Sequence, residues 1–295
     1  MVKYRKRHRQ TVGASVLCGR PVQNMSEVIT TVIYVIPDAE KLPEYVEFSR
    51  QYDLGWEFND FMYPSVLEDE EIKAGIIDKY RSYDMPARLS LHGAFLDVTV
   101  HSGDVRIRDI SDFRIDQSIE VAKALGCRKV IFHSNIIPNF IDAFYCDDWV
   151  SKNAEYWTAK ARQNPDIDLL MENMFDMTPD LMARLAEEIS DVPNFGLCLD
   201  YSHASIFCAG GSSADIFVDK LAPYVKHIHI NDCDLMHDGH LPIGDGMVDW
   251  ERFAEHYSGR MSGASVLIEV KGLERQKRSL EFLTELFARY GIDPR

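Results

Sequence analysis

The sequence predicts a single α/β domain of the (β/α)8 barrel class. Three observations support this fold. Short β-branched and apolar runs alternate with helical patterns from Met25 onward. Eight such strand–helix pairs follow one another with short connections, which favours one barrel over two domains. The length of 295 residues is also typical of a barrel of this kind.

The first half of the chain contains four of these pairs. The strand candidates are apolar runs, and the helix candidates include a segment with clear 3.6-residue periodicity. We expect the helix at residues 110–125, which has this periodicity, to end at Gly126, because glycine favours the left-handed conformation after a helix. The expected strands are residues 28–36, 55–59, 87–92 and 129–133, and the expected helices are residues 38–52, 67–83, 110–125 and 149–163.

The second half repeats this alternation. We expect Thr178 to cap the fifth helix with Pro179 in its first turn, and Asp249 to cap the helix that begins near Trp250. On the seventh strand, His227 is expected to face the helix layer, out of phase with His229. The expected strands are residues 168–173, 196–200, 225–230 and 266–270, and the further helices are residues 215–221, 250–257 and 274–290.

Composition narrows the classes of function. The formal net charge of -15 disfavours a surface that holds nucleic acid, because phosphate contacts need clustered Lys and Arg. The six cysteines are scattered without a CxxC pair, so we expect reduced thiols and a cytoplasmic protein. No apolar run approaches the length of a membrane span.

The first 24 residues differ from the rest of the chain. They contain six Lys or Arg and no Asp or Glu. We expect residues 1–24 to form a disordered leader and residues 25–295 to form the barrel. The alternative for the leader is a nucleic-acid-binding arm at Arg5–Arg9. A secretory signal is excluded because the leader has no apolar h-region.

Histidines and acidic residues occur at the ends of six consecutive predicted strands. Because the carboxyl ends of barrel strands meet at one rim, we expect these side chains to gather there. Carboxylates with imidazoles suit Zn, Mn, Fe or Co better than Ca, and the absence of Cys at these positions favours a catalytic metal. The candidates are His92, His133, Glu172, Asp200, His203, His229, Asp238, His240 and Glu269.

Each candidate also has a structural interpretation. A single strand-end histidine is more often a hydrogen-bonded structural residue than a ligand, and Asp200 with His203 could form only a capped turn. Glu172 and Glu269 carry the stronger signal, since each interrupts an apolar strand. Burying an acid there is costly unless it is paired or bound to metal. Competing motifs, namely GxSxG, the Walker loop and HExxH, are missing from the sequence.

Seven blocks in this order and spacing resemble the xylose isomerase-like TIM barrel superfamily, which includes sugar phosphate isomerases/epimerases and endonuclease IV. The blocks are LHGAFLD, VIFHSN, LLMENMF, LCLDYSH, HIHIND, DGHLPIGDG and LIEV. The resemblance covers the chain from about Val28 to its end. It implies the fold, and different functions for different branches of the superfamily.

The sugar isomerase branch implies one divalent ion, Zn, Mn or Co, held by Glu172, Asp200, His229 and Glu269. The two glutamates would move a proton at the carbon beside a carbonyl, through an enediolate. A carbohydrate substrate would then contact residues around the ion. We expect these contacts at His92, His203, His240, Asn173 and Lys271. Assembly into homo-oligomers is left open.

The endonuclease IV branch implies the main alternative, a zinc phosphodiesterase acting on abasic DNA. There, nine ligands hold three zinc ions, and all nine candidates above have a counterpart in that pattern. The acidic charge argues against a DNA-gripping rim. A metal-dependent dehydratase of a polyol-type substrate and a non-catalytic metal-binding relic are further alternatives. We therefore expect an isomerase or epimerase first.

Overall fold

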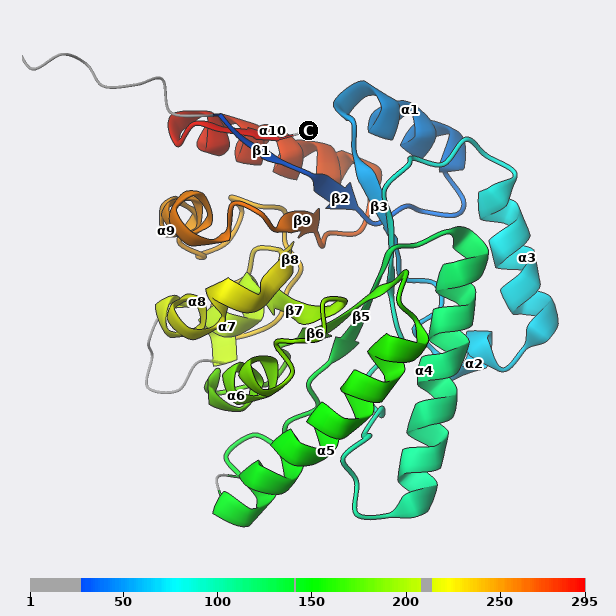
Figure 1. Cartoon of the computed structure of the whole chain (residues 1–295). Helices are drawn as coiled ribbons and strands as arrows, with labels where there is room; N and C mark the ends of the chain where they lie inside the picture. The colour runs from blue at the N-terminus through cyan, green and yellow to red at the C-terminus, as the bar shows by residue number, and fades with distance from the viewer. Residues whose placement is uncertain (1–27, 141, 208–213, 295) are drawn as a thin grey trace, which may run out of the picture.

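The computed structural model describes residues 28–140, 142–207 and 214–294, so the expected leader lies outside the described residues. Eight parallel strands, β2 to β9 in chain order, form a closed barrel that helices surround (Figure 1). This confirms the predicted fold. The barrel strands are β2 Ile33–Val35, β3 Gly55–Phe58, β4 Leu89–His92, β5 Lys129–His133, β6 Asp168–Glu172, β7 Phe195–Asp200, β8 Val225–Ile230 and β9 Ser265–Ile268.

Acidic residues start four of the helices. The side chains of Asp69, Asp104, Asp142 and Asp249 each accept a hydrogen bond from the first turn, where the helix dipole also favours negative charge. None of the described helices combines the length and the apolarity of a membrane span. The helices are α1 Leu42–Tyr52, α2 Pro64–Leu67, α3 Glu70–Arg81, α4 Val105–Leu125, α5 Ala143–Gln163, α6 Asp180–Glu188, α7 Tyr201–Phe207, α8 Asp215–Leu221, α9 Trp250–His256 and α10 Leu273–Arg289.

Several helix boundaries differ from the prediction. The helices α4 and α5 begin five and six residues earlier than expected, because exposed apolar residues in their first turns hide the amphipathic pattern. The helix expected at 67–83 is α3, which is shorter at both ends, and neither α2 before it nor α7 was predicted. The expected cap at Thr178 is wrong, since α6 begins after Pro179 without a side-chain cap. Gly126 does end α4, with a φ of 81°.

The segment expected as one strand at 28–36 is two strands. Residues Ile29–Thr31 form β1, which pairs with the C-terminal strand β10, Ile292–Pro294, outside the barrel. Only β2 enters the barrel, between β3 and β9. Strand β10 was not predicted. Because the two partners are far apart in the chain, no local pattern could reveal their pairing.

The main apolar core lies between the strands and the helices, whereas the barrel interior is largely polar. Only two small apolar clusters form inside the barrel within the described residues, Tyr34 with Ile36 and Leu267, and Ile131 with Leu170 and Cys198. Alternation along each strand then places polar side chains above them, at the carboxyl ends. The register shows this directly, since His133 lies beside Glu172.

Candidate metal centre

Four of the candidate ligands meet at the carboxyl end of the barrel. Glu172 ends β6, Asp200 ends β7, His229 lies near the end of β8, and Glu269 follows β9. Their potential ligand atoms all lie within 4.8 Å of one another. His229 Nδ1 is 3.3 Å from Glu172 Oε1 and 3.7 Å from Glu269 Oε2. The structure therefore assembles the quartet that the resemblance implies.

Each side chain of this quartet has at least one buried polar atom without a hydrogen bond to the described residues. One oxygen each of Glu172, Asp200 and Glu269, together with both ring nitrogens of His229, has no hydrogen-bond partner in the described part of the chain. Leaving buried polar atoms unpaired costs free energy. Burial raises the pKa of Asp200 to about 7. The positive charge of His203 opposes this shift, and the negative charges of Glu269 and Glu172 add to it. This donor set fits a divalent cation, which would pair the free atoms and neutralise the crowded carboxylates.

A second group shares Glu172. His92 Nε2 and His133 Nε2 lie 3.6 Å and 3.7 Å from Glu172 Oε2. Burial lowers the pKa of His133 to about 3, so this imidazole is neutral, which is the form that binds metal. The three side chains also qualify as a candidate ligand group.

A third group links the loop after β8 to the quartet. Asp238 Oδ2 lies 3.3 Å from His203 Nε2 and 3.0 Å from His240 Nε2. Burial would raise the pKa of Asp238, but the two histidines hold it well below its usual value. His240 adopts a φ of 42°, a strained conformation for a residue with a side chain. All nine candidate ligands thus gather at one rim.

A cavity of about 300 Å³ opens above these groups, a volume suited to a small molecule. Glu172 and Glu269 line it, as does Lys271. Asn173 does not line it: its amide donates to Asp200 O and accepts from Asp200 N, both at 2.9 Å, so it positions that strand end. A larger surface hollow of about 730 Å³, between α1 and the start of α10, has no histidine among its lining residues.

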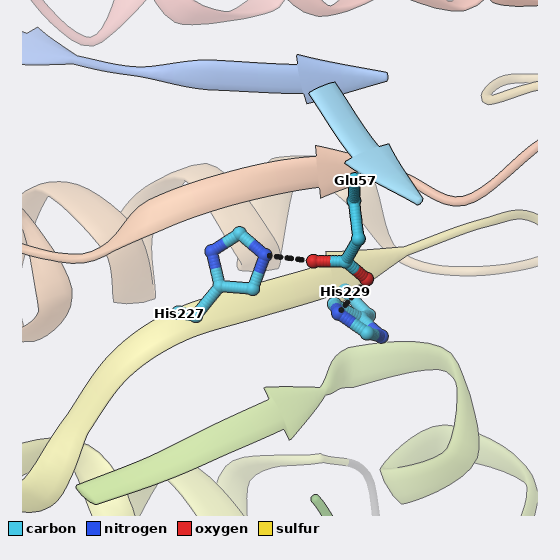
Figure 2. A group of neighbouring side chains, drawn as sticks. All are labelled: Glu57, His227 and His229. Atoms are coloured by element: carbon cyan, nitrogen blue, oxygen red, sulfur yellow. Dashed lines mark ion pairs between the residues drawn. The ribbon is translucent and has the colours of Figure 1, made fainter. Parts of the chain in front are cut away.

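Sequence reasoning missed Glu57 and misplaced His227. Glu57 lies on β3, fully buried, with its carboxylate between His227 and His229 (Figure 2). The expectation that His227 faces the helix layer is wrong, because residues two apart on a strand share a face. Glu57 interrupts the apolar run Gly55–Phe58, which is the same signal that identified Glu172. Burial would raise the pKa of Glu57, but the two histidines hold it below its usual value.

Comparisons with known proteins agree with the barrel fold. A family model described as xylose isomerase-like TIM barrel matches residues 52–286. The curated relative MJ1311 of Methanocaldococcus jannaschii, an uncharacterized protein, is 26% identical over 206 residues, which are 66% of this chain and 68% of the relative.

Two solved structures have the same fold. The TTHB071 protein of Thermus thermophilus, soaked with ZnCl2, superposes with a TM-score of 0.69 and 23% identity. A D-tagatose 3-epimerase-like protein superposes with a TM-score of 0.69 and 21% identity. Each match covers 88% of this chain and 98% of the other.

Proposed function

Because this chain belongs to the xylose isomerase-like TIM barrel family, we propose that it is a divalent-metal-dependent sugar or sugar-phosphate isomerase or epimerase. One observation carries the proposal. Glu172 and Glu269 both line the cavity, and each has a buried oxygen without a hydrogen-bond partner among the described residues. The likeness to a D-tagatose 3-epimerase-like protein and to a zinc-soaked structure supports it.

The mechanism assigns the two glutamates to proton transfer. An ion held by the quartet would polarise the substrate's carbonyl and hydroxyl oxygens. One glutamate takes the proton from the carbon beside the carbonyl. The electron pair of that C–H bond forms a carbon–carbon double bond, and the π pair of the carbonyl moves onto its oxygen, which gives an enediolate. The other glutamate returns a proton, which reforms a carbonyl. Return to the opposite face of the same carbon gives the epimer. Return to the former carbonyl carbon, with the hydroxyl proton passing from one oxygen to the other, gives the isomer.

The remaining cavity side chains would orient the substrate. His92, His203, His240 and Lys271 all line the cavity and carry nitrogen atoms that can contact sugar hydroxyls or a phosphate. The small volume suits a carbohydrate, as does a lining that combines these polar groups with apolar side chains such as Met62 and Phe95. A cytoplasmic location stays a prediction from the sequence, and the oligomeric state stays open.

Solvent exchange tests this proposal directly. Protein purified without chelator is first assayed for metal, with about one Zn, Mn or Co per chain expected. It is then incubated in deuterium oxide with a panel of ketoses, aldoses and their phosphates. We expect deuterium at the carbon beside the carbonyl of at least one sugar, and none with Glu269→Gln. Metal-loaded wild-type protein that exchanges no sugar on the panel would refute the assignment.

One observation favours a second candidate, a zinc phosphodiesterase of the endonuclease IV kind. The structure brings the two further ligand groups, around His133 and around Asp238, to the same rim as the quartet. The net charge of -15 opposes it. Cleavage of a duplex with an abasic site, at low salt with zinc, would establish this activity, and intact duplex would remove it. A dehydratase would instead convert a polyol-type substrate with loss of water.

A further inference from the structure

The carboxylate of Glu57 lies directly beneath the proposed metal site, although it is not part of the quartet. Its Oε1 lies 3.1 Å from His229 Nε2, and its Oε2 lies 3.2 Å from His227 Nε2. All three side chains are fully buried. Figure 2 shows the carboxylate between the two imidazoles, which come from the same strand. His229 therefore has a carboxylate on each side of its ring.

We infer that Glu57 is a positioning residue, which holds His229 with its proton on Nε2 and its Nδ1 lone pair directed at the quartet. The inference rests on the proposed function, since it concerns how the metal ligand is prepared. Glu57 itself touches neither the ion nor the substrate. Its role is to select one tautomer and one ring orientation of His229.

The two nitrogens of His229 face different partners. Nδ1 lies 3.3 Å from Glu172 Oε1, within the quartet, whereas Nε2 faces Glu57. A neutral imidazole carries one proton, and a nitrogen that binds a cation must be the unprotonated one. The negative charge of Glu57 stabilises the proton on Nε2, so Nδ1 is left free. Carboxylates that orient metal-binding histidines in this way also raise the basicity of the ligand.

The other atoms around Glu57 hold it in place. Ser90 Oγ donates to Oε2 at 2.8 Å, and His227 contacts the same oxygen. His227 Nδ1 in turn lies 2.7 Å from Ser265 Oγ, which accepts from Lys129 Nζ at 2.6 Å. Oε2 is thus occupied by these partners, and Oε1 is left to His229. Neither imidazole N–H bond is aligned as in a hydrogen bond, so both contacts act mainly through charge.

Glu57, His227 and His229 could in principle hold a cation of their own, since their ligand atoms lie within 4.8 Å of one another. Two features favour the positioning role instead. A second ion would require His229 to lose both ring protons, because Nδ1 already faces the quartet. The ammonium of Lys129, one serine away from His227, adds a positive charge where an ion would need negative ones.

Metal affinity tests this inference without any substrate. Metal-free wild type, Glu57→Gln and Glu57→Leu would be titrated with Zn²⁺ against a chromophoric chelator, and with Co²⁺ to record the absorption spectrum. We expect affinity to fall about 10- to 100-fold for the leucine variant, with a changed cobalt spectrum. The fall should be smaller for the glutamine variant, because its amide oxygen can still face Nε2. Gln117→Leu, a buried polar residue on α4 away from the site, is the matched control and should bind as wild type does.

The outcomes separate the two proposals. Wild-type affinity and an unchanged cobalt spectrum for Glu57→Leu would overturn the positioning role alone. A wild type that binds neither ion would overturn the metal site and with it this inference. Wild-type affinity for the glutamine variant, together with a loss for the leucine variant, would indicate packing rather than charge and would also overturn it. If circular dichroism shows that the leucine variant does not fold, the glutamine variant provides the test. We expect it to bind Zn²⁺ more weakly than wild type and to show a changed cobalt spectrum.

Discussion

Two sets of buried carboxylates at the carboxyl end of the barrel differ in how their oxygens are paired. Asp232, just after β8, accepts four hydrogen bonds: from the backbone N–H groups of Cys233, Val248 and Gly244, and from Trp250 Nε1, at 2.8 to 3.1 Å. In contrast, Glu172, Asp200 and Glu269 each retain an oxygen without a partner in the described segments. Both sets are buried.

This difference separates structure from function. A buried carboxylate with four donors is satisfied by the fold and has nothing left to bind. Asp232 anchors the loop that carries Asp238 and His240, and even the backbone is fitted to it: a Cβ at Gly246 would lie 2.2 Å from its Oδ1. The quartet is the opposite case, because its free oxygens have no hydrogen-bond donor among the described residues and would be paired by a cation.

The largest effect that we expect concerns Glu269→Gln. The substitution keeps the shape of the side chain but removes the base, so kcat for an identified substrate should fall about 10²- to 10⁴-fold. Because Glu269 is not needed to satisfy the fold, the free energy of unfolding of the metal-free protein should change by less than about 1 kcal/mol. Steady-state kinetics and urea denaturation check the two parts. A variant with near-normal turnover would show that Glu269 is not a functional carboxylate.

Metal removal should produce the next effect. At free metal 100 times above its Kd, the ion stabilises the fold by about 2.7 kcal/mol, and chelation should abolish this gain together with activity. Thermal and urea unfolding with and without chelator measure it. Asp232→Asn should retain the full metal-dependent increment, whereas Glu269→Gln should show a smaller one. Equal increments in the two variants would contradict the assignment of Glu269 as a ligand.

The reverse pattern is expected for Asp232→Asn. An amide nitrogen would face N–H donors in place of one oxygen, leaving buried groups unpaired and costing about 1–3 kcal/mol of stability. Urea denaturation of the metal-free variant measures the loss, and plasma mass spectrometry should find the wild-type metal content. Loss of metal without loss of stability would mean that Asp232 belongs to the site.

The smallest effect provides the baseline. Arg50 and Asp84 form an exposed ion pair at 3.2 Å, far from both carboxylate sets in the chain. Arg50→Ala should change the free energy of unfolding by no more than about 0.5 kcal/mol, because exposed pairs contribute little. The same urea measurements check this value. A loss of stability as large as that of Asp232→Asn would contradict the view that the hydrogen bonds of a buried acid contribute more than an exposed ion pair.

Much of the fold could be predicted from local patterns. The bounds expected for residues 129–133, 215–221 and 225–230 agree with β5, α8 and β8. These segments are short, apolar or amphipathic, and bounded by polar residues, so local sequence suffices. The prediction failed at β1 and β10, whose pairing depends on contacts across the whole chain, and at the capped first turns of α4 and α5.

The sequence by itself determined which ligands reach the rim. Any parallel barrel brings its strand ends together, so the order of histidines and acids along the chain is enough to predict that the nine candidate ligands gather at one rim. The quartet of Glu172, Asp200, His229 and Glu269 was implied by the resemblance to the superfamily. Only the tertiary structure decided which atoms remain unpaired and which are satisfied. Glu57 on β3 meets His229 on β8 across the barrel interior, and no spacing in the sequence encodes that contact. Closure of the barrel creates it, because it brings inward-facing side chains of distant strands together in the interior.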